Sequence, residues 1–287
     1  MTEKFQILLC TNGDEASQPA LAYGIWLAEL LQASVHLLGI VENPQAKPAL
    51  EALLEEIAGR LKEKNIQVRR EIDSGRGSVV IARHTEPEIY LTVVGRLGRP
   101  AWRRFVQGRS FRRLLRQVES PILYVPEGEI PLKHLLICMG GLGYAEGVVR
   151  LGAHLAQASG ARVTVLHVVE PASLEYPTAR EVQEHKEKIL ESDTPQAQSL
   201  KAALNTLLAA GLQVDLKVRY GNIVHEILHE VREGDYTMVG LGSPYSAQSL
   251  RHLFLPNVTA EVAEALNLPV LTVRYGHDLL EEGDRKD

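Results

Sequence analysis

The chain contains an internal repeat, and this feature constrains its fold more than any other. Four segments of the first half return in the same order in the second half, with similar patterns of apolar residues. The paired segments are residues 7–13 and 135–141, 32–34 and 157–159, 35–41 and 163–169, and 120–125 and 268–273. Four matches in one order indicate that a complete structural unit has been duplicated within the 287 residues.

Each half alternates short β-branched runs with segments of 3.6-residue apolar periodicity, which predicts alternating strands and helices. Near-continuous apolar strands between helices are typical of a mainly parallel sheet covered on both faces. We therefore expect an α/β protein of two tandem Rossmann-like domains, each with a five-stranded mainly parallel sheet and helices on both faces. The domains are expected at residues 1–128 and 132–276, before a charged C-terminal tail at 277–287.

The bulk composition argues against several classes of protein. A formal net charge of −5 disfavours general nucleic-acid binding. The sequence has no run of about eighteen apolar residues and no signal-peptide pattern at its N-terminus, so we expect a cytoplasmic protein without a membrane partner. Cys10 and Cys138 each lie at the end of a predicted buried strand, which favours reduced core thiols over a disulfide.

A glycine-rich loop follows the apolar run 89–94. Gly95, Gly98 and Gly108 punctuate it, and glycine lets backbone N–H groups approach a phosphate because it has no Cβ. Segment 96–116 also holds eight arginines and no acidic residue, and arginine presents a planar fork of donors suited to phosphate. The three aromatic residues there are too few for a base-stacking platform. We therefore expect this segment to bind an anionic small ligand. The alternatives are an RNA-binding patch, an ordinary turn after a strand and a solvated helix face.

The duplication, the order of elements and the glycine loop together resemble the universal stress protein family in its tandem form, over residues 4–275. The resemblance implies a domain that holds ATP in some members and acts through partners in others. In ATP-holding members an Asp after the first strand contacts the nucleoside, the residue after the second strand meets the base, and the glycine loop with its Ser or Thr holds the phosphates. Carried over to this chain, the first-half nucleotide site comprises Thr11, Asn12, Val41, Gly95, Gly98, Gly108, Arg109 and Ser110.

Both halves depart from the family pattern. In the first half Asn12 stands at the Asp position, where restoring Asp is expected to strengthen or preserve binding, and Arg109 displaces Ser110 by one place. In the second half Gly140 stands at the Asp position and Pro256, which has no N–H, at the last glycine. The lower-ranked second site comprises Gly140, Val169, Gly240, Gly242, Asn257, Val258 and Thr259. We expect the first half, rather than the second, to bind ATP or a related adenine nucleotide. The nucleotide is expected with or without a bound Mg²⁺ ion.

The fifth strands, predicted at residues 120–125 and 268–273, are short and apolar and should lie at sheet edges. An uncovered apolar edge is an aggregation hazard, and family members cover it by setting two such strands antiparallel across a dimer. The resemblance therefore implies that the two halves pair with each other about a pseudo-two-fold axis. Any homodimer of whole chains would then use other surfaces.

The function expected from these residues is a regulatory role in the stress response through nucleotide binding. We assign no catalytic residues, because no side chain is visibly placed as a general base. One alternative is a nucleotide-free interaction or scaffold module with degenerate clefts and an unknown protein partner. Another is a slow ATPase or a self-phosphorylating enzyme, which phosphate release would identify.

Residues 225–229 match the H-E-x-x-H pattern of zinc proteases, with His225 and His229 on one helical face. A catalytic zinc site needs a third ligand, and Arg232 occupies the third-histidine position of the extended motif. The segment is better explained as the third helix of the second repeat. From sequence we therefore assign no metal ligands, and we interpret His36 and His84 as ordinary buried or surface histidines.

Overall fold

The computed structural model describes residues 5–85, 90–96, 108–140, 145–170, 186–243 and 258–274. The first repeat contains the elements β1 (Gln6–Thr11), η1 (Glu15–Ser17), α1 (Gln18–Leu31), β2 (Ser34–Val41), η2 (Pro44–Ala46), α2 (Lys47–Glu63), β3 (Val68–Ser74), α3 (Gly77–Arg83), β4 (Leu91–Val94), α4 (Gly108–Gln117) and β5 (Ile122–Tyr124). The second repeat contains β6 (His134–Met139), α5 (Glu146–Ser159), β7 (Arg162–Val169), α7 (Lys186–Glu191), α8 (Pro195–Ala209), β8 (Val214–Tyr220), α9 (Ile223–Glu233), β9 (Met238–Ser243), α10 (Val258–Ala265) and β10 (Val270–Arg274). The expected tail at 277–287 lies outside the described residues.

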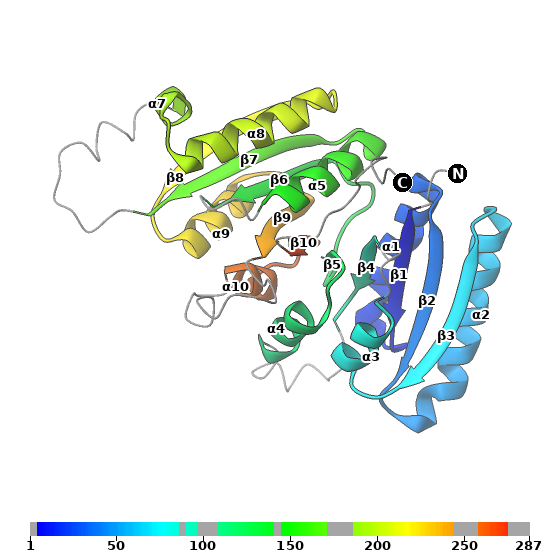
Figure 1. The fold of residues 1–287 in the computed structure, drawn as a ribbon. Helices are drawn as coiled ribbons and strands as arrows, with labels where there is room; N and C mark the ends of the chain where they lie inside the picture. Colours follow the sequence, from blue (N-terminus) through cyan, green and yellow to red (C-terminus); the bar gives the residue numbers. More distant parts are fainter. Residues whose placement is uncertain are drawn as a thin grey trace, which may run out of the picture.

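The ten strands within the described residues form one continuous sheet with the order β3-β2-β1-β4-β5-β10-β9-β6-β7-β8 (Figure 1). Strands within each repeat are parallel, and the repeats meet where β5 pairs antiparallel with β10. At the centre of this junction Leu123 lies opposite Leu271, and these two residues follow Pro121 and Pro269 at the same spacing. Equivalent residues of the two repeats therefore pair with each other, which places a pseudo-two-fold axis at this junction. The expected tandem α/β fold and the expected pairing of the halves are both confirmed.

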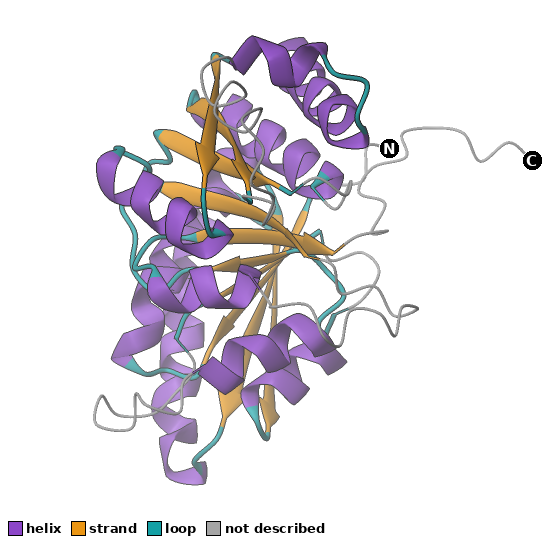
Figure 2. Ribbon diagram, turned by 90° about the vertical axis from the view of Figure 1, so that its left-hand side faces the viewer, coloured by secondary structure: helices purple, strands orange, loops and turns teal. Residues whose placement is uncertain are grey.

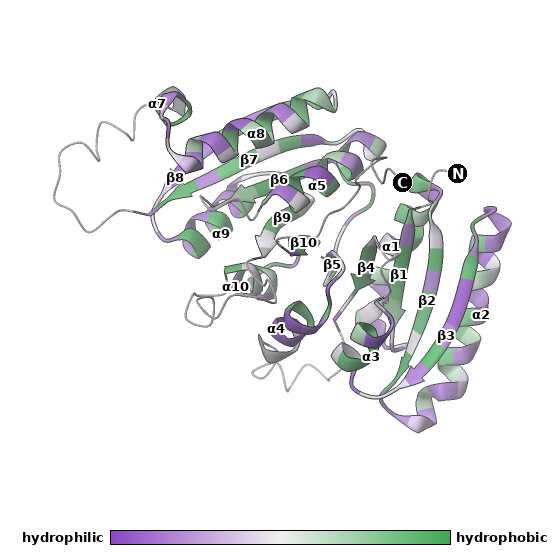
Figure 3. Cartoon of the chain, in the orientation of Figure 1, coloured by the Kyte–Doolittle hydropathy of each residue, from purple (hydrophilic) through white to green (hydrophobic). Residues whose placement is uncertain are grey.

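Helices cover both faces of the sheet, as Figure 2 shows. One apolar cluster joins the sheet to α1, α2, α5 and α8, and a second joins it to α3, α4, α9 and α10. The two clusters use alternate strand residues, such as Leu9 for the first and Leu8 for the second, because successive side chains of a strand point to opposite faces. The inner strand β1 is therefore apolar and buried almost throughout, whereas the edge strand β3 carries hydrophilic residues (Figure 3).

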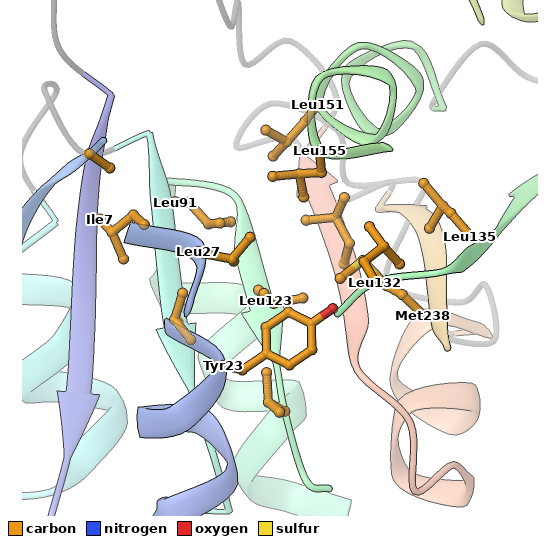
Figure 4. Packing of buried hydrophobic residues seen from close by; sticks show 14 of the residues in the cluster. Ile7, Tyr23, Leu27, Leu91, Leu123, Leu132, Leu135, Leu151, Leu155 and Met238 are labelled. Carbon is orange, nitrogen blue, oxygen red and sulfur yellow. The ribbon is translucent and has the colours of Figure 1, made fainter. Parts of the chain in front are cut away.

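The first cluster is continuous across the junction between the repeats (Figure 4). Its members there come from α1, β5, the linker, α5 and β9. They include Tyr23, Leu27, Leu123, Leu132, Leu151, Leu155 and Met238, all no more than 4 % exposed. The two repeats thus share one hydrophobic core on this face of the sheet.

Polar contacts join the repeats on the other face. The Arg112 guanidinium lies 3.5 Å from the Glu261 carboxylate, which links α4 to α10. Arg274 of β10 donates to the carbonyl of Leu115 in α4 at 2.7 Å. Because both contacts cross between repeats, they depend on the antiparallel β5–β10 pairing.

Local signals in the sequence explain several helix ends. Helix α1 stops at Leu31 because Gln32 adopts a left-handed conformation with φ of 50°. Thr194 caps α8 by accepting from the Ala197 amide, and Asn222 caps α9 by accepting from the His225 amide at 3.1 Å. Among the described helices, none is long and apolar enough to cross a membrane.

Both cysteines are free and buried, as the sequence predicts. Cys10 lies on β1 and Cys138 on β6, within the cluster that faces α3, α4, α9 and α10. Burial raises the pKa of both thiols, so they stay protonated and unreactive.

Candidate functional site

The candidate nucleotide site lies at the carboxyl edge of the first-repeat strands. There β1 has β2 on one side and β4 on the other, so the chain order reverses between β1 and β4. Ligands of open α/β sheets bind at such a switch point. The last residues of these strands are Thr11, Val41 and Val94, which brings the expected positions 11, 12, 41 and 95 to one edge.

The loop after β1 is held by its own side chains. The Thr11 and Ser17 hydroxyls share a 2.7 Å hydrogen bond, and the Gly13 amide donates to the Thr11 hydroxyl at 3.1 Å. The Asn12 side-chain amide donates to the Asp14 carboxylate at 2.7 Å, while its carbonyl accepts from the Asp14 backbone N–H at 3.2 Å. The loop therefore carries a carboxylate two residues beyond the position where family resemblance places one. Sequence reasoning missed Asp14, although its place two residues after Asn12 could have found it.

Strand β2 ends at the same edge with an apolar residue, Val41. Val41 is 6 % exposed and belongs to the core, and its carbonyl accepts from the Gly75 amide at 3.1 Å. The next residue, Glu42, accepts from the amide of Gly77, the first residue of α3, at 3.1 Å. The backbone hydrogen bond and the core packing therefore hold Val41 in place.

Gly95 follows β4 and lies tightly against the start of α1. A Cβ added there would come within 3.1 Å of the Ser17 Cα and the Ala20 Cβ. Close packing alone therefore favours glycine at this position, whether or not a phosphate binds. Gly98 lies outside the described residues.

Helix α4 begins at Gly108 and includes Arg109 and Ser110, whose side chains are not among those described. The Phe111 ring contacts the Tyr124 ring with centroids 4.7 Å apart, and Tyr124 lies opposite Val94 at the end of β4. The first turn of α4 is therefore at the carboxyl edge of the sheet. Its backbone N–H groups and helix dipole favour an anion there.

The second candidate site lies at the opposite edge of the sheet, because the antiparallel β5–β10 pairing reverses the strand direction. Gly140 is exposed, and a Cβ added there would meet open space. The Val169 carbonyl accepts from the Gly221 amide at 3.1 Å, as Val41 does from Gly75.

The remaining positions of the second site are packed against their own repeat. Thr259, 2 % exposed, donates its hydroxyl to the Gly242 carbonyl at 3.0 Å. Gly240 lies beneath Val148, whose side chain would be 3.1 Å from an added Cβ. Val258 is the first residue of α10, and Asn257 lies outside the described residues.

Comparisons with known proteins agree with this architecture. The model of the universal stress protein family matches the chain twice, at residues 5–126 and 131–274. The chain belongs to the universal stress protein family. This membership assigns it a stress-response role.

Several relatives match this chain over nearly their full length. Universal stress protein Slr1230 of Synechocystis sp. is 21% identical and covers 93% of this chain and 99% of its own length. A universal stress protein structure from Archaeoglobus fulgidus has a TM-score of 0.71 at 17% identity, covering 94% of this chain and 98% of that one. A functionally unknown Pseudomonas aeruginosa protein has a TM-score of 0.67 at 16% identity, covering 94% and 92%. At these identities the structures establish the fold alone.

Two arginines of the basic segment contact groups other than a small ligand. Arg96 donates to the Asn267 side chain at 2.8 Å and lies 3.4 Å from Glu127, and Arg112 contacts Glu261. Burial raises the pKa of Tyr124, although the Arg96 guanidinium acts in the opposite sense. These arginines join the two universal stress protein repeats, a role that the sequence did not predict.

The H-E-x-x-H segment forms α9, as expected for the third helix of a universal stress protein repeat. Arg219 contacts the His229 Nδ1 at 2.8 Å and the Glu226 carboxylate at 3.6 Å. His225 is 69% exposed, and its ring centroid is 6.2 Å from that of His229. The segment is thus engaged in an ion-pair network.

Proposed function

We propose that this chain binds one adenine nucleotide, such as ATP, in its first repeat and acts by regulation rather than turnover. The observation that carries the proposal is the convergence of the β1, β2 and β4 ends with the first turn of α4 at a strand-order switch point. We place this function in the cytoplasm, where the buried free thiols Cys10 and Cys138 would stay reduced.

Each part of the edge suits a different part of a nucleotide. The amides at the start of α4, with Arg109 as its second residue, favour phosphates. The Asn12–Asp14 pair offers a donor and acceptors for ribose hydroxyls, and the end of β2 at Val41 lies where the family resemblance places the base. Asp14 also offers carboxylate oxygens, which are the ligands that Mg²⁺ prefers.

A search for nucleotide in the purified protein tests the proposal. The full chain is heat-denatured and the supernatant is separated by anion-exchange chromatography, with a mock purification as control. ATP is then titrated into nucleotide-free protein by calorimetry, where we expect one site per chain. Absence of bound nucleotide together with no heat of ATP binding would reject the proposal.

A nucleotide-free interaction module is the second candidate, and one observation favours it. The side chains at key positions of both clefts are satisfied within the protein, Asn12 by Asp14 and Thr259 by Gly242. Such a module would bind a protein partner whether or not ATP is present. Failure of the purified chain to bind ATP at millimolar concentration would support this candidate.

The two candidate sites differ, so the number of ATP molecules bound per chain tests their ranking. Thr259, which corresponds to the phosphate-binding Thr of the family, uses its hydroxyl on Gly242. We therefore propose that the second repeat contributes little nucleotide affinity. Two equal and tight ATP sites per chain would contradict this ranking.

A further inference from the structure

Two histidines and two carboxylates meet on the face of the sheet that α3 covers. His36 lies on β2, Glu71 and Asp73 lie on β3, and His84 directly follows α3. The register sets Glu71 beside Leu38, two residues from His36, so these side chains share a face. His36 lies five residues before Val41, the last residue of β2, and Glu71 lies three residues before Ser74, the last residue of β3.

Three of these residues approach one another as metal ligands do. The His36 Nε2 is 3.2 Å from the Glu71 Oε2, and the His84 Nδ1 is 3.7 Å from the Glu71 Oε1. The ligand atoms of all three residues lie within 4.8 Å of one another. Tetrahedral zinc, with bonds of 2.0–2.2 Å to nitrogen and oxygen, separates its ligands by about 3.3 Å. Small side-chain movements would close the site.

Burial fits such a site as well. The His36 side chain is fully buried, that of His84 is 13% exposed and that of Glu71 is 35% exposed. The cluster therefore has a closed inner side and an outer side that reaches solvent. An ion could enter from the outer side and keep water at its fourth position.

The second nitrogen of His84 is also held. Its Nε2 lies 3.0 Å from the Asp73 Oδ2, and Arg83 lies 3.1 Å from the same oxygen. A metal-binding histidine almost always donates its other N–H to such an acceptor, which fixes the ring and its tautomer. Asp73 thus leaves the His84 Nδ1 directed at Glu71.

We propose that His36, Glu71 and His84 bind one zinc-class divalent ion per chain, with Asp73 as the positioning residue for His84. Two imidazoles and one carboxylate favour Zn²⁺ over Mg²⁺ or Ca²⁺, which prefer sites made entirely of oxygen. Arg69 contacts Glu71 at 3.1 Å and is 56% exposed, so water can replace this contact when Glu71 binds the ion. The site is independent of the nucleotide proposal.

The second repeat shows why one ion per chain is expected. The register places Lys217 beside Leu166 as it places Glu71 beside Leu38, and Glu230 follows Ile223 at the spacing of His84 from Gly77. At these positions Lys217 donates to Glu230 at 2.6 Å. A direct acid–base pair fills the place that the histidine cluster occupies in the first repeat.

Zinc titration of the full chain tests the proposal. Protein treated with chelator is titrated with Zn²⁺ alone by calorimetry, and Co²⁺ then reports the geometry through its visible absorption. We expect one saturable site with a tetrahedral Co²⁺ spectrum. Asp73→Asn should weaken Zn²⁺ binding by about 10–100-fold, the usual effect of losing an outer-shell partner, and His84→Gln by at least as much.

A matched control uses the other histidine pair. His225→Gln/His229→Gln removes one exposed and one partly buried histidine at i, i+4 and should leave the Zn²⁺ affinity unchanged. His36→Thr, which copies Thr164 of the second repeat, should abolish the site, with circular dichroism confirming the fold. Absence of saturable Zn²⁺ binding to the full chain would overturn the proposal. So would an affinity that survives His84→Gln or that falls in the control.

Discussion

At the scale of single residues, the hydrogen bond between Asn12 and Asp14 adds a stability cost to the Asn12→Asp change. Resemblance suggests that Asn12→Asp restores a nucleoside contact. In the structure, the new carboxylate would face that of Asp14 across the present 2.7 Å hydrogen bond. We expect Asn12→Asp to lower the free energy of unfolding by about 1 kcal/mol, the repulsion of two unit charges about 4 Å apart in water. Urea denaturation at pH 7 measures it.

A swap of the two residues provides the control. Asn12→Asp/Asp14→Asn places one amide against one carboxylate again, with the roles exchanged. The double variant should therefore recover most of the lost stability, which defines a coupling between the two sites. Equal stability of Asn12→Asp and the wild type would show that the pair does not form.

Arg109 tests the phosphate end of the proposed nucleotide site. As the second residue of α4 it starts a helix whose dipole favours anions. We expect Arg109→Ala to weaken ATP binding by about 1.5–3 kcal/mol, the contribution of a hydrogen bond to a charged group. The matched control is Arg116→Ala, which removes an arginine from the last turn of the same helix. Calorimetry showing the same ATP affinity for both variants would exclude Arg109 from the site.

The residues of the candidate site illustrate what sequence alone could predict. Strand ends and glycines at 11, 41 and 95 converge because a parallel sheet brings its carboxyl ends together, and that follows from element order. The hydrogen-bond partners of the site residues cannot be predicted from element order. The Asp14 contact to Asn12 and the Thr259 contact to Gly242 depend on loop conformation and side-chain direction. The histidine cluster likewise joins residues from β2, β3 and the end of α3, whose separation in sequence hides their contact.

At the scale of elements, the two repeats stabilise the same strand–helix contact with opposite charges. In the first repeat, Asp73 and Glu71 on β3 contact Arg83, the last residue of α3, and His84, which directly follows it. In the second, basic residues on β8 contact acidic Glu230 and Glu233 on α9. Both edge strands therefore carry charges that also discourage pairing with another sheet.

Glu230 is the centre of the second of these contacts, and its removal should be costly. Its side chain is 1% exposed and accepts from Lys217, Arg219 and Tyr236, each at 2.6 Å. Burial raises its pKa, but the hydrogen bonds from Lys217, Tyr236 and Arg219 outweigh burial and hold the pKa below its usual value. We expect Glu230→Gln to lower the free energy of unfolding at pH 7 by about 1.5–3 kcal/mol.

The pH dependence of this difference gives a second readout. Because the folded pKa is lowered, the stability from Glu230 is complete above the unfolded value of about 4.5 and is lost as pH falls through the folded pKa. Wild type and variant should therefore converge in acid. Glu233→Gln removes a 56% exposed carboxylate from the same helix and should cost less than about 1 kcal/mol. Equal losses in the two variants would contradict a special role for Glu230.

At the scale of the whole molecule, the repeat order predicts the topology, because the apolar edge strand that ends one repeat finds its own counterpart in the other repeat of the same chain. The linker then has to pass close to the junction, and Gly128 shows how close. A Cβ at Gly128 would lie 2.7 Å from the Pro269 ring, directly before β10. The contacts of Arg96, Arg112 and Arg274 with the opposite repeat could not be predicted, because they arise only once the sheet has twisted and paired.

The first repeat alone should not remain a monomer. Expression of residues 1–128 removes β10, leaving β5 as an open edge, and uncovers Tyr23, Leu27 and Leu123 of the shared core. An apolar strand edge pairs with another chain when its partner is absent. We expect a dimer in which β5 pairs antiparallel with its copy about Leu123, or aggregation. Adding residues 129–287 should convert that dimer into a one-to-one complex, because Leu271 then replaces the second Leu123. A folded, monomeric 1–128 in sedimentation velocity, unchanged by the second fragment, would show that each repeat is stable without the other.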